Sequence, residues 1–421
     1  MGLFSALFSG VNGINSNGNV ISVIGDNIAN VNTIGYKSSR AAFEDILAGS
    51  DSNVGLGSRV ASITAQFGQG GFESSSSVTD LAIDGKGFFM VKDPGDNSKF
   101  YSRAGQFVVD RDGYLANNKG LRLQGFSVDT SNNLTANVSD ISISTTPVSP
   151  NDTGEIALVM NLNSNSTTPA AFSTATPTTT SNFSTGVTVF DSLGNSHLVT
   201  IYFRKSASNS WSWYGLINGS EVTGPSSGVN VQAATGTLTF NSAGALTSAA
   251  TTTSDFDFLG ATQSQAITFD FGSIVSTGNG LDGATQFGSD SAVSNITQDG
   301  YASGSLKSIE ISPDGTITGN YTNGTNQTIA QVVLATFSDE TSLRRVGGNN
   351  YQETLGSGQP TVNGAGVAGK GNVVSSTLEQ SNVDLANELI KMVIIQRGFQ
   401  ANTRTISTVN DLLAQLVTLG Q

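Results

Sequence analysis

The chain has 421 residues and a formal net charge of −13, and charged residues make up only 12% of it. This balance argues against a nucleic-acid partner, which requires a basic stripe to displace counterions from phosphates. The absence of cysteine excludes disulfides and thiolate chemistry, and a single histidine leaves few routes to nucleophilic or metal catalysis. The 49 glycines and many Ser, Thr and Asn residues are typical of turn-rich all-β proteins.

The N-terminal residues 3–31 carry apolar residues at intervals of seven. This spacing predicts a long helix with one narrow apolar face. Glycines at positions 10, 13, 18 and 25 each cost a helix up to about 1 kcal/mol, so we expect the segment to become ordered against a partner. The predicted face consists of Leu7, Val11, Ile14, Ile21, Ile24 and Ile28.

The apolar start of the chain is not expected to act as a secretory signal. No Lys or Arg precedes Lys37, and Gly and Asn interrupt the apolar run. No stretch approaches the roughly 18 consecutive apolar residues of a transmembrane helix. We therefore expect a chain that does not span a membrane.

The middle of the chain reads as two sets of strands after a connector. Short turns, weak alternation and glycines predict a connector at 34–74, and period-two apolar segments between 81 and 115 then predict a β-meander. A Thr/Ser/Pro-rich stretch from about residue 146 marks a boundary. A hairpin of 187–190 with 197–203 follows, continued by strands at 211–217, 237–240 and 266–271, and strands return at 308–311, 316–317 and 331–337.

The C-terminal residues 378–419 show the longest heptad pattern in the chain. It predicts a helix of about 55 to 60 Å whose apolar face is narrow. Ser376 with Glu379, or Ser381 with Asp384, fits a capping box at its start. Periodicity alone allows this helix to lie on its own core or on a partner. The predicted face consists of Leu378, Leu385, Leu389, Met392, Phe399, Ile406, Val409, Leu413 and Leu416.

Few motifs suggest chemistry. Residues 110–113 contain part of a calcium-loop pattern, but the remaining ligands are missing, so a hairpin turn is expected. His197 lies in a predicted strand without a catalytic partner at a diagnostic spacing, which favours a structural role. We expect no catalytic residue, no metal site and no cofactor.

Two terminal segments carry a specific resemblance. Residues 27–37, NIANVNTIGYK, closely resemble a signature of the bacterial flagellar axial proteins, which comprise rod, hook and hook-associated proteins. Residues 378–385, LEQSNVDL, and 396–399, QRGF, are similar to their C-terminal segment. The signature positions are Asn27, Asn30, Thr33, Gly35, Tyr36 and Lys37.

Internal segments extend the resemblance. Residues 102–107, 112–114 and 123–126 resemble the core β-domain of this family. Five further segments resemble the hook members of the family, at residues 191–197, 286–289, 298–304, 347–351 and 357–360. The likeness covers essentially the whole chain, except for the Thr/Ser-rich stretch 163–183.

The resemblance implies a multidomain, mainly β fold with antiparallel sandwich or barrel-like domains. Its N- and C-terminal α-helices are expected to form a coiled-coil core. Residues 1–33 and 376–421 would form the helical inner layer of a tube, and 34–74 with 355–375 a connector. Residues 75–145 with 285–354 would form a discontinuous inner β-domain, into which 146–284 insert an outer β-domain.

The function implied is that of a structural, non-enzymatic subunit. It would polymerise into the extracellular flagellar hook, a flexible tubular universal joint that transmits torque from rod to filament. Expected partners are other copies of the chain, the distal rod, the hook cap, the hook-filament junction proteins and the flagellar type III export apparatus. A distal rod protein is an alternative, disfavoured by the separate β-domain, and a surface adhesin is a remote one.

Overall fold

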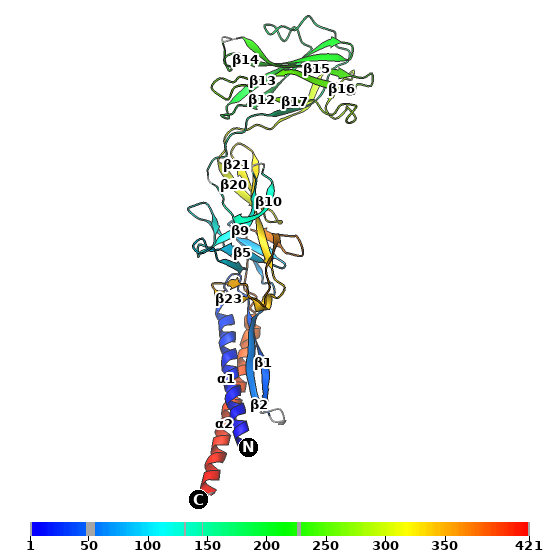
Figure 1. Ribbon diagram of the computed structural model, residues 1–421. Helices are drawn as coiled ribbons and strands as arrows, with labels where there is room; N and C mark the ends of the chain where they lie inside the picture. Colours follow the sequence, from blue (N-terminus) through cyan, green and yellow to red (C-terminus); the bar gives the residue numbers. More distant parts are fainter. Residues whose placement is uncertain (1, 48–54, 130–131, 145, 225–228, 420–421) are drawn as a thin grey trace. The chain divides into compact units, whose positions relative to one another are not determined.

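The computed structural model describes residues 2–47, 55–129, 132–144, 146–224 and 229–419. The chain forms two compact units. The first comprises Met1–Thr145, Ser308–Asn320 and Asn326–Gln421, and the second Thr146–Lys307 with Tyr321–Thr325. Both are mainly β, and the first unit also holds the two terminal helices, as the sequence predicts (Figure 1).

The terminal helices pack against each other in the first unit. Helix α1 (Gly2–Ala29) and helix α2 (Leu385–Leu419) lie side by side, with a hairpin of β1 (Ser39–Leu47) and β2 (Gly55–Ala65) alongside α1 (Figure 1). The predicted pairing of the two ends is therefore confirmed. The hairpin replaces the turns expected after residue 34. Its alternation is weak in the sequence because much of it stays exposed, with one side packed on α1.

Helix α2 begins later than predicted. Thr377–Glu379 forms strand β27, which pairs with β3 (Phe72–Ser74), so Leu378 is not helical. Ser376 has a φ of 53°, which excludes it as a normal helix cap. Asp384 caps the helix instead, since its Oδ1 accepts from the N–H of Asn387 at 3.1 Å. The 35 residues of α2 span roughly 52 Å.

The main sheet of the first unit has the order β20-β21-β22-β9-β5-β6-β24-β23, with β7, β8, β10 and β25 at its sides. The predicted simple meander is wrong, because β5 and β9 both pair with β22 from far along the chain. Its core packs Phe88, Met90, Tyr101, Val333 and Tyr351.
The strands of this sheet are β5 (Phe88–Lys92), β6 (Lys99–Ser102), β7 (Val108–Val109), β8 (Leu115–Ala116), β9 (Arg122–Val128), β10 (Leu134–Asp140), β20 (Leu306–Ile311), β21 (Thr316–Tyr321), β22 (Asn326–Thr336), β23 (Arg344–Gly347), β24 (Asn350–Gln352) and β25 (Thr361–Gly364). A separate two-stranded sheet pairs β4 (Leu81–Asp84) with β26 (Asn372–Ser375). A 3-10 turn covers Glu340–Ser342.

The second unit is a β-sandwich. One sheet is the antiparallel series β12 (Phe183–Phe190), β13 (Ser196–Ala207), β14 (Ser210–Asn218), β15 (Asn230–Phe240) and β16 (Leu246–Ser254). The other joins β11 (Glu155–Asn161) to β17 (Thr268–Asp270), β18 (Ala284–Thr285) and β19 (Ala292–Gln298). A single core with Phe203, Trp211 and Trp213 takes residues from both sheets.

Two expectations for this unit need correction. The predicted hairpin is confirmed, with Val187 opposite Val199, but β17 pairs in parallel with β11 rather than continuing that sheet. Residues after 284 do not return directly to the first unit, because β19 pairs with β11. Both errors arise from pairings between strands more than a hundred residues apart, which local patterns do not show. The division into four parts stays a prediction.

Candidate assembly interface

Helices α1 and α2 run antiparallel and approach closely through glycines. A Cβ at Gly10 would lie 2.9 Å from Cγ1 of Ile406, and a side chain at Gly13 would overlap that of Asn402. The relation is then reversed, because a Cβ at Gly398 would lie 3.2 Å from Nδ2 of Asn17. Each helix thus places an Asn over a Gly of the other, and the glycines allow the close contact.

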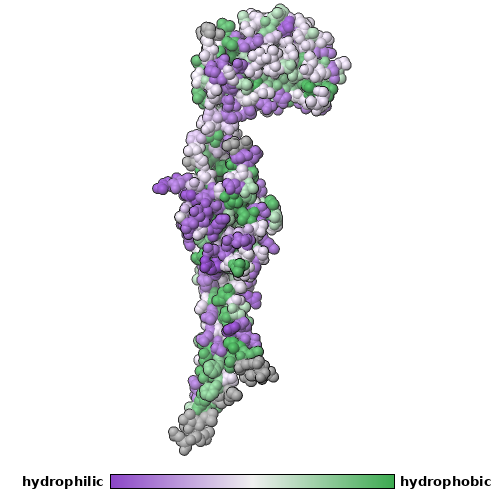
Figure 2. Space-filling model, in the orientation of Figure 1, coloured by the Kyte–Doolittle hydropathy of each residue, from purple (hydrophilic) through white to green (hydrophobic). Residues whose placement is uncertain are grey.

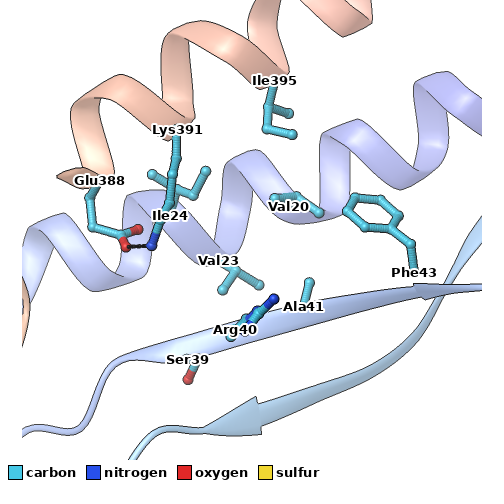
Figure 3. Close-up of a pocket in the computed structure, with 10 residues that line it drawn as sticks. All are labelled: Val20, Val23, Ile24, Ser39, Arg40, Ala41, Phe43, Glu388, Lys391 and Ile395. Carbon is cyan, nitrogen blue, oxygen red and sulfur yellow. Dashed lines mark hydrogen bonds and ion pairs between the residues drawn. The ribbon is translucent and has the colours of Figure 1, made fainter.

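Further along the pair, an apolar hollow of about 240 Å³ lies between the helices and β1. Figure 3 shows Val20 and Ile24 of α1 on the side of Ile395 of α2, while Val23 points toward β1 and Phe43 of β1 lies at one side. The Glu388–Lys391 ion pair, 2.7 Å long, closes the opposite side (Figure 3).

The hairpin is held to α1 by polar contacts. The Nδ2 of Asn12 donates to the carbonyl of Leu56 at 2.8 Å, and Oγ of Ser16 donates to the carbonyl of Ser58 at 2.7 Å. Polar side chains therefore occupy a second contact face of α1. Sequence reasoning missed this face, because it sought only apolar residues.

The predicted assembly residues differ in burial. Ile24 and Val409 are buried, and Leu378 is half-buried in β27. Val11, Leu385 and Leu389 are exposed. Leu416 lies outside the described side chains. The half-buried helical residues are Leu7, Ile14, Ile21, Ile28, Met392, Phe399, Ile406 and Leu413.

The face of α1 that meets α2 is therefore displaced from the predicted heptad. It contains Gly10, Gly13 and Asn17, which hydrophobicity does not mark. On α2, Met392, Phe399 and Ile406 of the predicted heptad are half-buried, whereas Glu388, which is not part of that heptad, is buried. The pair of glycines at positions 10 and 13, three residues apart, was the signal available for the α1 face.

Large apolar side chains stay exposed at the helical end of the first unit. Figure 2 shows apolar surface gathered over this end of the unit. Contiguous apolar surface of this kind marks an interaction site. The exposed residues are Phe4, Phe8 and Val11 of α1, Phe43, Leu47 and Ile63 of the hairpin, and Leu385, Leu389, Ile390, Val393, Ile394 and Leu412 of α2.

The signature residues surround the end of α1. The amide of Asn27 bonds both backbone groups of Ser39, at 2.8 and 2.9 Å, and so fixes the start of β1. The Tyr36 hydroxyl donates to Oδ2 of Asp26 at 3.0 Å, and burial raises the pKa of Tyr36. Oγ1 of Thr33 donates to Oδ1 of Asn30 at 3.0 Å.

Two further signature positions are set by close packing. Gly35 has a φ of 68°, and a Cβ there would overlap the backbone of Ala104. The Lys37 ammonium lies 2.6 Å from Oε1 of Glu379, and both side chains are fully buried. Burial lowers the pKa of Lys37, although the Glu379 carboxylate opposes this shift. The signature therefore joins α1, β1 and the C-terminal segment.

Two further residues singled out in the sequence, His197 and Asp110, make local contacts. His197 lies between Glu221, 2.8 Å from Nδ1, and Asp191, 3.3 Å from Nε2, and it stacks on Phe258. Oδ1 of Asp110 accepts backbone N–H groups of its own turn, as expected for a hairpin. Among the described residues, no group of three or more His, Asp or Glu side chains could hold a metal ion. No described helix is long and apolar enough to cross a membrane.

The chain matches curated flagellar hook proteins along its whole length. It is 37% identical to flagellar hook protein FlgE of Escherichia coli, over 98% of this chain and 100% of that protein. It is 33% identical to the FlgE of Borreliella burgdorferi, over 99% of this chain and 100% of that protein.

The chain belongs to the flagellar hook protein family. Family models agree along the chain: the flagellar hook protein FlgE/F/G D1 domain matches residues 82–156, and the flagellar basal body protein FlaE D2 domain matches 161–301. The flagellar basal body rod FlgEFG protein C-terminal model matches 374–419.

A solved structure shares the fold of this hook protein family member. The crystal structure of Helicobacter pylori flagellar hook protein FlgE2 superposes with a TM-score of 0.54 at 16% identity, over 73% of this chain and 100% of that one. The resemblance seen in the sequence is thus confirmed. This hook protein is a structural component of the extracellular flagellar hook, where copies of the chain polymerise.

Proposed function

We propose that the terminal helices are the polymerisation element of this hook subunit and form the inner layer of the tube. The observation that carries the proposal is the exposed apolar surface around α2, including Ile390 and Ile394, each about three-fifths exposed at 60% and 61%. Burying such surface is favourable by about 25 cal/mol per Å², and neighbouring copies provide the means. Contacts that repeat without closing a ring build a helical tube.

The finer role is that of a flexible universal joint. The connector and the β-domains, in the four parts given by the sequence, would form the layers outside the helices. The surface of the chain is neutral-polar, with only 12% charged residues, which suits weak contacts that slide between outer domains. The proposed role is structural and not enzymatic.

The proposed partners follow from the place of a hook in the flagellum. The tube would join the distal rod at one end and the junction proteins at the other, and it would grow under a hook cap. The chain would travel unfolded through the type III export apparatus, and the absence of cysteine suits that passage. The assembly positions named from the sequence, together with Ile390 and Ile394, are the proposed subunit contacts.

Electron microscopy of the purified full-length chain under polymerising conditions tests the proposal. Short curved tubes are expected from the wild-type chain. Shapeless aggregates, or a monomer at every concentration and salt condition that polymerises a known hook protein, would contradict it. The E. coli relative provides the matched positive control.

A further inference from the structure

The Thr/Ser-rich stretch between β11 and β12 contains a loop that leaves the second unit and returns to the same point. Nδ2 of Asn182 donates to the carbonyl of Thr167 at 2.8 Å, so residues 168–181 start and end side by side. The described chain between these two strands forms no helix or strand. The loop is closed on itself by the N–H of Ser173, which donates to Oγ1 of Thr180 at 3.1 Å. Compact loops with adjoining ends are Ω-loops, which frequently carry function, and we call residues 168–181 the Ω-loop.

The Ω-loop lies on the side of β13 and β14 that faces away from the core. Tyr202 and Tyr214 lie opposite each other on these strands. The ring of Phe172 stacks on that of Tyr214, with centroids 3.8 Å apart and planes 1° apart. Arg204 follows Tyr202 in the outward row of β13, and its Nε and Nη2 donate to the carbonyls of residues 169–170 at 2.8 and 3.1 Å. We call Tyr202, Arg204 and Tyr214 the platform.

The β-sandwich is complete without this loop. Its core takes Phe203, Trp211 and Trp213 from the inward rows of the same strands, and no core member within the described part of this unit lies at 163–182. The platform holds the Ω-loop by one ring and by main-chain carbonyls, which are alike whatever side chain they carry. It therefore suits any extended segment that presents an aromatic ring.

The distribution of charge indicates which partner can bring such a segment. The second unit carries ten acidic and three basic residues, so two of these units repel each other when their charged surfaces meet. Residues 156–190 include no charged residue, so a second copy can approach the Ω-loop and the platform without that repulsion. The second copy also carries the segment that fits.

We infer that the platform is a docking site whose ligand is the Ω-loop, either that of its own chain or that of a second copy. In a single chain the tethered loop occupies the site, because a short tether gives an effective concentration of about millimolar. Exchange of an identical element between copies costs little, because each contact is replaced by the same contact. Neighbouring copies in a tube are close enough for this exchange. Only that last step depends on tube formation, since the platform belongs to the second unit.

A labelled synthetic peptide of residues 167–182 tests the site in place of a second copy's loop. The host is the full-length chain, kept below the polymerising concentration, with residues 168–181 replaced by Gly-Ser-Gly, a link that the adjoining ends permit. Fluorescence anisotropy should show binding to this loop-excised chain and at least tenfold weaker binding to the wild-type chain, whose platform is occupied. Wild-type amide exchange in β12–β16 shows that the host is folded.

Matched variants separate docking from non-specific adhesion. Phe172→Ala in the peptide should weaken binding at least tenfold, whereas Ala171→Ser, at the exposed neighbouring position, should not change it. Arg204→Gln in the host should also weaken binding at least tenfold. Arg111→Gln makes the same change of charge at a 94% exposed arginine of the first unit and should have no effect. If the loop-excised chain does not fold, the full chain with Phe172→Ala is the host and should bind the peptide at least tenfold more tightly than wild type.

A pair of full-length chains tests whether a second copy provides the ligand. Tyr214→Ala removes the stacking partner of Phe172, so the donor chain offers a free Ω-loop. Mixed with the loop-excised chain below the polymerising concentration, the donor should form a heterodimer in sedimentation velocity. Adding Phe172→Ala to the donor should abolish the heterodimer.

Three results would overturn the inference. The first is a folded loop-excised chain that does not bind the peptide. The second is binding that is equal for the wild-type and Phe172→Ala peptides. The third is peptide binding without a heterodimer, which would exclude a second copy as the partner. None of these results depends on tubes, so a wild-type chain that fails to polymerise would contradict the proposed function and leave the platform standing.

Discussion

Gly13 of α1 and Asn402 of α2 lie opposite each other, and the Asn402 amide occupies the space that a side chain at position 13 would fill. Gly18, in the same helix, has no atom within 4 Å of its would-be Cβ. The two glycines are equal as helix breakers in the sequence but differ in what they do. Gly13 permits close packing, whereas Gly18 only weakens the helix.

Alanine substitutions at these two glycines should have opposite effects. Gly18→Ala is expected to stabilise α1 by up to about 1 kcal/mol, because alanine has the higher helix propensity. Gly13→Ala gains the same propensity but overpacks the contact, at a cost of about 1–3 kcal/mol, and should give a net loss. Amide exchange within α1 of the full-length monomer measures both. Equal effects at the two positions would show that Gly13 is not a packing contact.

Ile406→Asp should abolish polymerisation and leave the melting of the β-units unchanged. Ile406 packs against Gly10, and a carboxylate there would be desolvated without a partner. Thr405→Asp places the same charge at an exposed neighbouring position and is the comparison for the monomer helices. Sedimentation measures the amount of polymer, and calorimetry measures the melting of the β-units. Wild-type-like tubes from Ile406→Asp would refute the assignment of Ile406 to the assembly interface.

The outer face of α2 should matter only between subunits. Ile390→Ser and Ile394→Ser remove apolar side chains that are 60% and 61% exposed in the single chain. We expect the critical concentration for polymerisation to rise at least tenfold, with amide exchange of α1 and α2 in the monomer unchanged. If polymerisation stays normal, this face is not a subunit contact.

The first unit should lose stability in alkali. Burial raises the pKa of Tyr351 to about 12, whereas an unfolded tyrosine titrates near 10. Above about pH 10 the unfolded chain releases this proton and the folded chain keeps it, so the free energy of unfolding falls as pH rises. The loss between about pH 10 and 12 is about 2 kcal/mol for this residue.

Tyr351→Phe should reduce the fall in the free energy of unfolding between about pH 10 and 12. The variant retains the ring that packs against Phe67 and Phe88 but has no proton to release. Part of the pH dependence should remain in the variant, because burial also raises the pKa values of Tyr36 and Tyr101. Urea unfolding of the first unit at several pH values between 9 and 12 measures the difference. Parallel curves for wild type and variant would show that Tyr351 does not titrate in this way.

Periodicity predicted α2 well where the helix packs along its length. Met392, Phe399 and Ile406 recur with the heptad and are half-buried, and Ile406 lies against Gly10 of α1. The same reasoning failed at Leu378, because strand pairing with β3 overrides a local helix pattern. Glu379 looked like a capping residue, yet its carboxylate binds Lys37 and Arg103.

The buried cluster of Lys37, Arg103 and Glu379 was beyond local sequence patterns for a physical reason. Its partners are buried charges, and single charged residues in a sequence carry no sign of burial or of a distant partner. The resemblance at residues 27–37 identified Lys37 as a signature position without showing what it binds. The hairpin β1–β2 was missed because much of it is exposed, so its apolar alternation is weak.

The central claim is that α1 and α2 build the inner layer of a tube. A helical reconstruction of polymerised wild-type chain by electron cryo-microscopy tests it most directly. The account predicts that α1 and α2 lie at the smallest radius, with Ile390 and Ile394 against a neighbouring copy and both β-units outside. A tube whose channel is lined by the β-units, with α2 exposed to solvent on the outside, would contradict it.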